Sequence, residues 1–376
     1  MEPSRSGRAE AASSPASDSP ATGMSRRGFL SAAAGSAVIA GTVSSAFAGT
    51  DKFGRDRDWT GAEPVLYPDP AWEVKDKRFS GRLVQAPLQR IWHGSGMDTG
   101  LWCEGPVWMG DWSCLLWSDI PNHRVLRWTE DDGHVSLFQH ESGYANGHGR
   151  DNQGRLLAME HDTRRVRRLE YDGTWTVLCD SFEGKKLNAP NDVAVHRDGS
   201  IFFTDPGYGI MDAYEGHKAP FELPTRVYRI DAAGKVTVAA EGPMRRPNGV
   251  CFSPDFKRLY VVDSGLSDGY PANIIVYDVN GTLLSNPKVF ADFAPGTTDG
   301  IRCDTDGNIW CAWGWGGPDT NGVRVHHPDG SVLAILHTPE VVANLCFGGN
   351  KRNRLFICGS TSLYGIYVNA TGSALG

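Results

Sequence analysis

Residues 246–265 read RPNGVCFSPDFKRLYVVDSG, and this stretch holds a unit that recurs along the chain. The unit starts with a polar residue, here Asn248, runs through a short apolar segment, turns at the polar tip SPDFK, and enters a second apolar segment, LYVVDS. Intervals of 42 to 57 residues separate the six polar residues that start such units: Glu104, Asn146, Asn191, Asn248, Asp299 and Asn344. Recurrence at this period is typical of a repeated supersecondary unit.

The segments between these units favour β-strands. Alternating third segments such as RVLRW and RVYRI, and fourth segments such as VSLFQ and VTVAA, are rich in β-branched and aromatic residues. The 45 Gly and 22 Pro among 376 residues, with no long amphipathic helical period after residue 50, agree with an all-β chain. The sequence therefore predicts an all-β fold, a six-bladed β-propeller over residues 85–376 with a metal ion in its central channel. A β-sandwich is the alternative, but six turn-punctuated repeats are more than one ordinary sandwich contains.

The last repeat leaves its blade one strand short. It ends near Asn369, with no room for a fourth strand. The segment LQRIW, residues 88–92, precedes Glu104 and has strand character. We expect it to complete the last blade, so that pairing of the two ends of the chain closes the ring and leaves few exposed edges.

The residues before the propeller divide into two parts. A stretch rich in Ser, Ala and Pro leads to the twin-arginine motif SRRGFL at residues 25–30, a short apolar run, and a cleavage site, AFA, at residues 46–48. We interpret residues 1–48 as a disordered stretch and a cleaved twin-arginine signal peptide rather than a membrane anchor, and residues 49–84 as an N-terminal extension. The sequence therefore predicts export by the twin-arginine machinery to the periplasm.

Charge and cysteine content narrow the function classes. The net charge of −7, without a long basic run, gives no support for nucleic-acid binding. The eight Cys have no CxxC spacing and fall mostly within predicted strands, where Cys behaves as a small buried apolar residue; whether any disulfide forms stays open. The eleven His contain no HExxH motif, so a zinc site of that kind is not predicted.

The polar residues at the repeat starts suit a hard cation. Carboxylates and amides converging at the mouth of a channel provide the oxygen ligands that Ca²⁺ prefers. We expect the metal ligands to be Glu104, Asn191, Asn248 and Asp299. Mg²⁺, Mn²⁺ and Zn²⁺ also accept oxygen ligands, so the identity of the ion stays open. The alternative is that Asn and Asp before Gly only form turns, which six such residues in register argue against.

Several longer motifs carry a family resemblance. They are EGPVW, LNAPNDVAVHRDGSIFFTDPGYGI, RPNGVCFSPDFKRLYVVDSG, TDGIRCDTDGNIW and NLCFGG, followed by LFICGSTSLYGIYV. Over roughly residues 85–370 the chain resembles the gluconolactonase and senescence-marker-protein (regucalcin) family, especially its bacterial gluconolactonase branch. The resemblance implies a six-bladed propeller with a divalent cation in the channel, and an enzyme that hydrolyses a lactone.

The resemblance also implies individual roles. Glu104 matches the carboxylate ligand of the first blade, and Asn191 an amide ligand or substrate contact. Asn248 matches a second amide ligand, and Asp299 a ligand that is also the general base, with the cation polarising the lactone carbonyl and Asp299 activating water. One departure is Ala189, where some animal members have arginine, so contacts to the sugar acid differ.

Other residues are candidates for the same site. Asn146 starts an inner strand and His161 ends a second strand, and both are candidate substrate contacts. Asp192 is a candidate proton donor, although strand alternation points it away from the side chain of Asn191. We expect Asp205 and Asp263, which end second strands, to organise turns.

Two further segments lie within reach of the predicted channel. The connection from Pro206 to Pro224 carries aromatic and polar residues and has the length of a lid. Trp313 and Trp315 are candidates for lining a more apolar pocket, or for packing between blades.

Three functions are compatible with this sequence. The first is a periplasmic lactonase that uses one divalent cation, with Ca²⁺ favoured, and acts on a small-molecule lactone of the gluconolactone type. The second is a propeller hydrolase of other lactones or phosphotriesters, which a more apolar channel would favour. The third is a non-catalytic calcium-binding propeller, since one fold serves many functions. The complete set of oxygen ligands argues against the third function and does not separate the first two.

Overall fold

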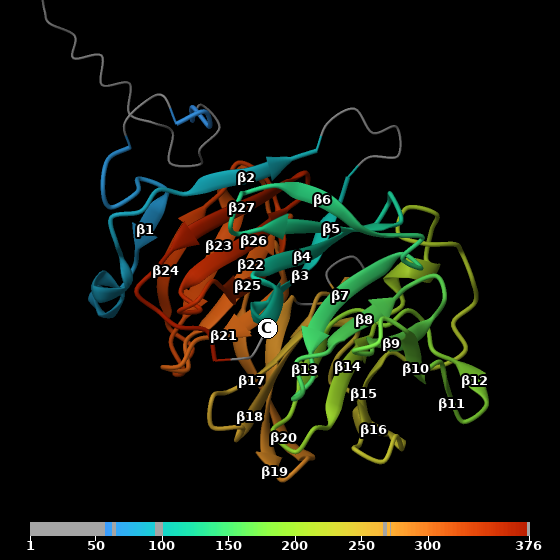
Figure 1. Cartoon of the computed structure of the whole chain (residues 1–376). Coiled ribbons are helices and arrows are strands. Elements are labelled where there is room, and N and C mark those ends of the chain that lie inside the picture. The colour runs from blue at the N-terminus through green and yellow to red at the C-terminus, as the bar shows by residue number, and fades with distance from the viewer. Residues whose placement is uncertain (1–56, 62–64, 95–100, 266–268, 271, 374–376) are drawn as a thin grey trace, which may run out of the picture. The chain divides into compact units, whose positions relative to one another are not determined.

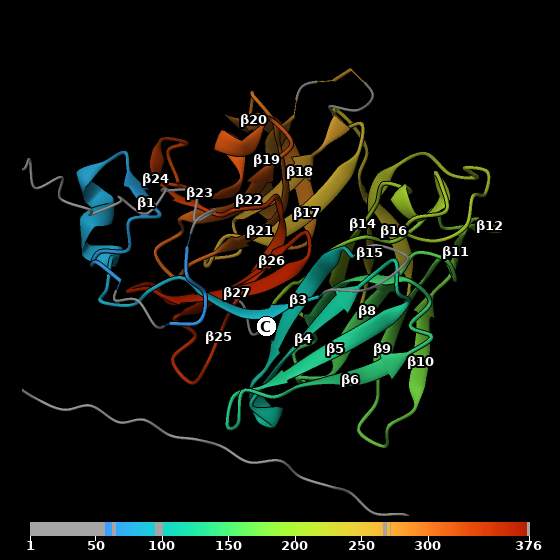
Figure 2. The same ribbon diagram turned by 90° about the horizontal axis from the view of Figure 1, so that it is seen from above.

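The computed structural model describes residues 57–61, 65–94, 101–265, 269–270 and 272–373. They belong to a compact unit of residues 49–376, and the predicted signal peptide lies outside the described residues. Six antiparallel sheets of four or five strands each are the blades. They are arranged around a common axis, as the two ribbon views show (Figure 1, Figure 2). The predicted six-bladed β-propeller is confirmed.

Blades 1 to 4 each consist of four consecutive strands, and the first of these strands is the innermost. Blades 5 and 6 each also include a strand from the N-terminal part of the chain. Blade 1 contains β3 (Cys103–Met109), β4 (Cys114–Asp119), β5 (Arg124–Thr129) and β6 (Val135–His140). Blade 2 contains β7 (Ala145–Arg150), β8 (Leu156–Glu160), β9 (Arg165–Leu169) and β10 (Trp175–Cys179). Blade 3 contains β13 (Val193–Val195), β14 (Ile201–Asp205), β15 (Arg226–Ile230) and β16 (Val236–Ala240). Blade 4 contains β17 (Pro247–Phe252), β18 (Arg258–Asp263), β19 (Asn273–Asn280) and β20 (Leu283–Asp292).

The last two blades contain strands from both ends of the described chain. Blade 5 contains β21 (Thr297–Cys303), β22 (Ile309–Gly314), β23 (Gly322–His326), β24 (Val332–His337) and, as a fifth strand, β1 (Trp72–Val74). Blade 6 contains β25 (Val342–Gly348), β26 (Arg354–Gly359), β27 (Ser362–Tyr367) and β2 (Gln89–His93). Because β2 pairs with β27, the predicted closure of the ring by the segment before Glu104 is confirmed.

The remaining elements are short. A hairpin of β11 (Ser181–Phe182) and β12 (Lys185–Lys186) follows blade 2. The 3₁₀ helices are η1 (Lys77–Arg82), η2 (Gly110–Trp112), η3 (Tyr208–Ile210) and η5 (Pro318–Thr320). Within the described part of the chain, no helix has the length and apolar character needed to cross a membrane.

The sequence did not predict β1 or its packing. Strand β1 pairs with β24, and Trp72 and Phe79 pack beside Trp310 of blade 5, with ring centroids 5.1 to 6.3 Å apart. A buried ion pair between Arg57 and Asp69 at 2.6 Å holds the chain just before it. The described part of the predicted extension is therefore packed onto the propeller. Three residues are too few for a strand to show its alternation in the sequence.

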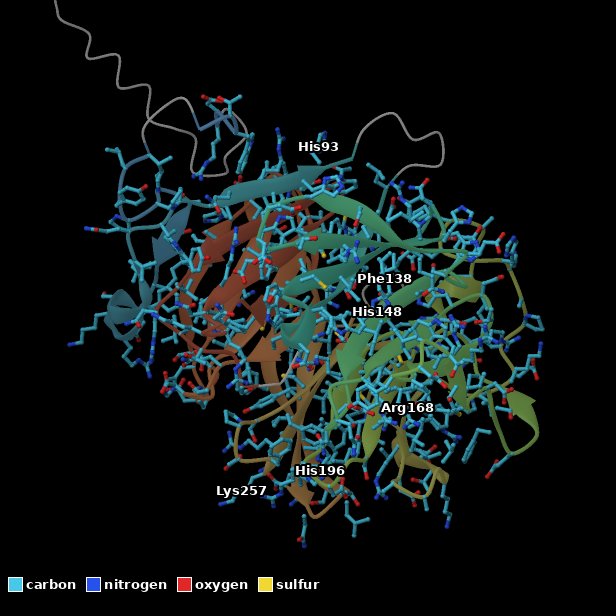
Figure 3. The ribbon with its side chains drawn as sticks, in the orientation of Figure 1. His93, Phe138, His148, Arg168, His196 and Lys257 are labelled. Carbon is cyan, nitrogen blue, oxygen red and sulfur yellow. The ribbon has the colours of Figure 1, made fainter. Side chains whose placement is uncertain are left out.

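The core lies between neighbouring sheets. Trp108 of blade 1 stacks on Phe356 of blade 6 with ring centroids 5.8 Å apart, and similar clusters fill the other blade interfaces. All eight cysteines are buried and unbridged. His148 of β7, labelled in Figure 3, has its Nδ1 3.0 Å from the Gly105 carbonyl oxygen, which links blades 2 and 1 close to the axis.

Candidate active site

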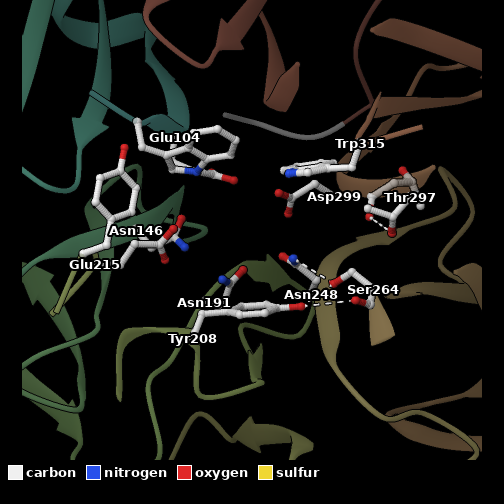
Figure 4. A pocket seen from close by; sticks show the side chains of 13 residues that line it. Glu104, Asn146, Asn191, Tyr208, Glu215, Asn248, Ser264, Thr297, Asp299 and Trp315 are labelled. Carbon is white, nitrogen blue, oxygen red and sulfur yellow. Dashed lines mark hydrogen bonds between the residues drawn. The ribbon is translucent and has the colours of Figure 1, made fainter. Parts of the chain in front are cut away.

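A cavity of about 500 Å³ opens at the starts of the inner strands. Figure 4 shows polar side chains from several blades pointing into it, and its lining residues are Trp102, Glu104, Asn146, Asn191, Tyr208, Tyr214, Glu215, Asn248, Ser264, Thr297, Thr298, Asp299 and Trp315. Five of the six repeated polar residues are in this set. The sixth, Asn344, contacts Glu104 instead.

Local backbone geometry aims these side chains at the axis. In blades 1, 2, 4 and 5 the pairing of the inner strand shifts near the repeated dipeptide, so that two of its residues face one residue of the next strand. A bulge of this kind bends the strand and redirects a side chain. The repeated polar residue can therefore face the cavity while the rest of its strand stays in the sheet.

The glycine after the polar residue has a packing role. A Cβ on Gly249 would overlap the backbone carbonyl of Asp299 in the next blade, and a Cβ on Gly147 would overlap that of Asn191. The Gly147 N–H donates to the Asn191 carbonyl at 2.8 Å. The Asn-Gly dipeptide is therefore more than a turn, because the small residue lets adjacent inner strands approach while its neighbour faces the cavity.

Glu104 is held by the blade on its other side. Its Oε2 accepts hydrogen bonds from the backbone N–H of Gly105 and from Nδ2 of Asn344, the latter at 2.9 Å. The amide of Asn344 is fixed in turn, since its Oδ1 accepts from the Leu345 N–H at 2.8 Å. The carboxyl group of Glu104 thus has a defined orientation at the cavity wall.

Asn248 belongs to a second fixed group on the opposite wall. Its Nδ2 donates to Ser264 Oγ at 3.1 Å, and Ser264 Oγ lies 2.7 Å from the hydroxyl of Tyr208 (Figure 4). The side chain of Asn248 also hydrogen-bonds the carboxyl group of Asp299, which partly offsets the rise in the pKa of Asp299. Asn191 and Asp299 line the same space, so the structure brings all four predicted metal ligands together.

The carboxyl groups of the cavity repel one another. Burial raises the pKa of Glu104 to about 7. Burial, with the nearby charges of Glu104 and Glu215, raises the pKa of Asp299 well above its ordinary value. Burial and Glu104 likewise raise the pKa of Glu215 to about 8. The described residues that line the cavity include these three carboxyl groups and no Lys, Arg or His.

This arrangement fits a divalent cation. Among the described residues no three His, Cys, Asp or Glu side chains form a metal cluster by themselves. A cation at Glu104 and Asp299 would therefore take its other ligands from the amide oxygens of Asn191 and Asn248, and a mixed carboxylate and amide set is suited to Ca²⁺. Its charge would favour the ionised carboxylates, and so act against both the burial and the repulsion that raise the pKa values of these groups.

Asn146 and His161 form a buried pair. Nδ2 of Asn146 lies 3.2 Å from Nε2 of His161, and Oδ1 of Asn146 has no hydrogen-bond partner although it is buried. Burial lowers the pKa of His161 to about 4, so its ring is neutral near pH 7. The His161 side chain has no exposed surface. The structure thus places Asn146 at the cavity and His161 behind it, so His161 acts on a ligand only through its neighbours.

The connection from Pro206 to Pro224 crosses the cavity mouth. The hydroxyl of Tyr214 donates to the Leu101 carbonyl of blade 1 at 3.0 Å, and Nδ1 of His217 lies 2.6 Å from Asp162 of blade 2. Tyr208 lies at the cavity wall, as described above. The predicted covering segment is therefore anchored to three blades besides its own.

Sequence reasoning missed Glu215 in this connection. It has no repeat partner and follows no strand, so the signal that identified the other site residues is absent. Two glycines of the segment could have indicated its position. A Cβ on Gly216 would overlap the Gly209 carbonyl, and a Cβ on Gly209 would overlap the side chain of His161. Two glycines required by close packing indicate that the segment lies against the site.

Asp192 is directed away from the cavity. Its carboxylate binds Arg302 at 3.0 Å and accepts from the Val250 N–H at 3.3 Å. It is therefore a buried link between inner strands, and the expectation that it donates a proton to substrate is not supported. Successive side chains of an extended chain point to opposite sides, so Asp192 points away from the cavity when Asn191 points into it.

The other acidic residues singled out by the sequence hold backbone. Asp205 accepts from the N–H groups of Asn188 and Ala189 at 2.8 and 2.6 Å, and Asp263 accepts from those of Arg245 and Arg246 at 2.9 and 2.7 Å. These carboxylates fix the turns that lead into β13 and β17, as predicted.

An aromatic rim surrounds the polar floor. Trp102 and Trp315 lie with ring centroids 5.7 Å apart, and Tyr214 stands on the same rim. Trp315 is 44% exposed. Trp313, in contrast, is buried beside the guanidinium of Arg324, so only one of the two predicted tryptophans lines the cavity.

Known proteins share this sequence and fold. Residues 102–361 match the SMP-30/Gluconolactonase/LRE-like region. The chain is 29% identical to a gluconolactonase of Zymomonas mobilis, over 93% of this chain and 99% of the relative. It is 30% identical to a pentonolactonase of Haloferax volcanii, over 68% and 80% of the two chains. The solved structure of a gluconolactonase from Xanthomonas campestris has a TM-score of 0.71 and 32% identity, covering 79% of this chain and 94% of that one.

Proposed function

The chain belongs to the SMP-30/gluconolactonase/LRE-like family, and from this premise we propose that it hydrolyses a sugar lactone of the gluconolactone type to the corresponding hydroxy acid. One observation supports this function above the others. Two carboxylates and two amides, Glu104, Asn191, Asn248 and Asp299, converge on the floor of one cavity beneath an aromatic rim. The four polar side chains suit a cation, and the aromatic rim above them suits an uncharged substrate with an oxygen-rich ring.

We further propose that the active protein holds one divalent cation at these four residues, most favourably Ca²⁺. The support is the chemistry of the donor set and the raised pKa values of Glu104 and Asp299. Such a cation supplies positive charge that polarises a carbonyl group.

The side chains of the cavity provide the remaining steps. Asp299, as a carboxylate, accepts a proton from the attacking water. Asn146 presents an unpartnered Oδ1 that can accept a hydrogen bond from a substrate hydroxyl. Trp102 and Trp315 cover the apolar face of the ring and exclude bulk water. A lactone with several hydroxyl groups makes use of all three features.

The aromatic rim also favours a second class of substrate. With Trp102, Trp315, Tyr208 and Tyr214 around its mouth, the cavity has enough apolar surface for a less polar lactone or a phosphotriester. Polar acceptors at the floor favour the sugar lactone, because an apolar substrate leaves the buried Oδ1 of Asn146 without a partner.

We propose that this reaction takes place in the periplasm. The support is the twin-arginine motif at residues 25–30, which precedes an apolar run and a cleavage site. Fractionation of cells that express the full chain tests this location, and a protein that remains in the cytoplasmic fraction at full length would contradict it.

The activity test uses chelator-stripped protein. Acid release from gluconic δ-lactone is followed against the spontaneous background while Ca²⁺, Mg²⁺, Mn²⁺ or Zn²⁺ is restored singly. We expect saturable hydrolysis that depends on the restored cation. A panel with a pentonic lactone, an aliphatic δ-lactone and a phosphotriester defines the substrate class. No rate above background on any lactone, with cation binding verified, would contradict the proposed function.

A further inference from the structure

We propose that Glu215 is the general acid of this site and protonates the ring oxygen that leaves when the lactone opens. This inference rests on the proposed lactonase function and deepens it. Hydrolysis of an aliphatic ester requires both a base for the water and an acid for the leaving alkoxide. Asp299 takes the first role, and the second requires another side chain of the cavity.

The position of Glu215 supports the assignment. It is carried by the connection between β14 and β15, whose other residues anchor it to neighbouring blades, and its carboxyl group lines the cavity. In Figure 4 it points into the cavity beside Asn146, on the side away from Asp299. An acid and a base on different sides of a bound ring can serve the leaving oxygen and the attacking water at the same time.

His161 fixes the direction of Glu215. Since Nε2 of His161 faces the amide nitrogen of Asn146 and the ring is neutral, the proton of the ring lies on Nδ1. Nδ1 lies 3.3 Å from the Glu215 carbonyl oxygen and 3.5 Å from its Oε2. The ring therefore holds the backbone of Glu215 through the hydrogen bond to its carbonyl oxygen and lies next to its carboxyl group, and His161 is a positioning residue.

The surroundings of Glu215 keep it protonated near neutral pH. The ionisable groups acting on it are Glu104 of β3, Asp212 of the same connection, and Asp299 of β21, together with the neutral His161. A cation at Glu104 and Asp299 would offset their charges, but burial, which is the largest effect, and the nearby Asp212, which does not line the cavity, still raise the pKa of Glu215. Oε2 of Glu215 has no cationic partner among the described residues of the site. Its side chain is only 20% exposed, which adds to this effect.

Other proton donors fit less well. Asp192 is bound to Arg302 below the cavity. The hydroxyl of Tyr208 is 2.7 Å from Ser264, and burial raises the pKa of Tyr208, so it is a weak acid. Asp299 lies on the side of the attacking water. To act as the acid as well, it would have to pass the proton taken from that water to the ring oxygen on the other side of the substrate. Glu104 is a proposed ligand of the cation, so Glu215 is the lining carboxyl group left to donate a proton.

The step balances in atoms and charge. The water oxygen forms a bond to the carbonyl carbon, and the water proton passes to the carboxylate of Asp299. The bond between that carbon and the ring oxygen then breaks, its electron pair goes to the ring oxygen, and Glu215 donates a proton there. The product is the hydroxy acid. Asp299 loses its proton to solvent and Glu215 regains one, so each turnover consumes one lactone and one water.

The test compares leaving groups in the metal-loaded protein. Glu215→Gln keeps the size and polarity of the side chain and removes its acidic proton. For an aliphatic δ-lactone such as gluconic δ-lactone we expect kcat/KM to fall by about 10² to 10⁴. For dihydrocoumarin, whose leaving phenoxide needs no acid, we expect a fall of less than about tenfold. Asp299→Asn should lose activity on both substrates, because the base acts on water in either case.

Two controls accompany the variant. Glu222→Gln makes the same chemical change in the same connection, outside the cavity, and should leave both rates unchanged. Thermal unfolding establishes that Glu215→Gln is folded. If it is not, Glu215→Ala replaces it, and added imidazolium, an external acid that still carries its proton near pH 7, is expected to restore part of its rate on the aliphatic lactone.

Each outcome has a distinct meaning. Equal losses by Glu215→Gln on the two lactones would mean that Glu215 only binds substrate, which overturns the inference. Unchanged rates on both lactones would overturn it as well. If the wild-type protein hydrolyses neither lactone, the proposed function itself is wrong, and the inference falls with it.

Discussion

At the scale of single residues, the site consists of side chains that face the cavity and side chains behind them that hold them in place. Asn344 is the clearest holder, since its Nδ2 donates to Glu104 at 2.9 Å while its own Oδ1 is fixed by the next backbone N–H. Partners of this kind set the orientation and basicity of metal ligands. The sixth repeated residue therefore belongs to the site without lining it.

Replacing Asn344 with Ala should weaken cation binding. Glu104 would lose a charge-assisted hydrogen bond and its fixed orientation, and losses of about 10- to 100-fold in metal affinity are typical of such changes. Calorimetric titration of chelator-stripped protein with Ca²⁺ measures the effect. Asn369→Ala, which removes an Asn side chain far from the axis, is the matched control. An unchanged affinity in Asn344→Ala would show that Glu104 does not depend on this contact.

Replacing Asp299 with Asn should separate activity from stability. The amide fills the same volume but cannot accept the proton of water, so we expect kcat to fall by about 10³-fold or more while the fold is kept. In chelator at pH 8 the variant should unfold at the same or a higher temperature than the wild type, because it removes one of three mutually repelling carboxyl groups. Retained activity would disprove the assigned role.

At the scale of elements, the dipeptide at each inner-strand start joins two functions. The polar residue faces the cavity, and in blades 2 and 4 the following glycine allows the next blade to approach. Gly249→Ala should therefore destabilise the protein by about 1 to 3 kcal/mol, because the new methyl group meets backbone rather than a movable side chain. Denaturant unfolding measures the change. Gly81→Ala is the control, since a Cβ there meets nothing within 4 Å.

The sequence predicted those elements that repeat. Six polar residues ahead of apolar strands predicted the propeller and five residues of the cavity wall, because the same packing requirement acts on each blade. The missing fourth strand of the last repeat predicted the closure of the ring. The place of Glu215 in the cavity could not be predicted in this way, and neither could the hydrogen bond from Asn344 to Glu104. One lies in a connection that occurs once, and the other depends on how the first and last blades meet. Strand β1 was missed because three residues carry no readable period.

At the scale of the whole molecule, the propeller brings like charges together that are far apart in sequence. Glu104, Glu215 and Asp299 come from blade 1, a connection of blade 3, and blade 5, and packing of the blades holds them around one cavity. The energy of that packing opposes their repulsion, so the protein should depend on a bound cation for part of its stability. Because these groups lose protons as the pH rises, the stability of the cation-free protein also depends on pH.

The stability of the cation-free protein should fall as the pH rises above neutrality. Glu104 and Glu215 have pKa values of about 7 and 8 in the folded protein, against 4.5 as the ordinary value, so the folded state binds more protons than the unfolded state between these limits. Stability of the cation-free protein must then fall as pH rises through this window, by on the order of 3 kcal/mol for Glu104 alone. Burial lowers the pKa values of His148, His161 and His326 to about 4, which works in the opposite direction below pH 6.5.

The clear window is therefore pH 6.5 to 8.5, where the carboxyl groups still titrate and these histidines no longer do. In chelator we expect the unfolding temperature to drop by several degrees across this window, and Ca²⁺ to raise it more at pH 8.5 than at pH 6.5, because protons compete with the cation for the same oxygens. Glu104→Gln should flatten the slope in chelator. A wild-type unfolding temperature that stays level or rises with pH would mean that the three carboxyl groups are not buried together in one cavity, since exposed carboxylates titrate near their ordinary values and leave this window without a slope.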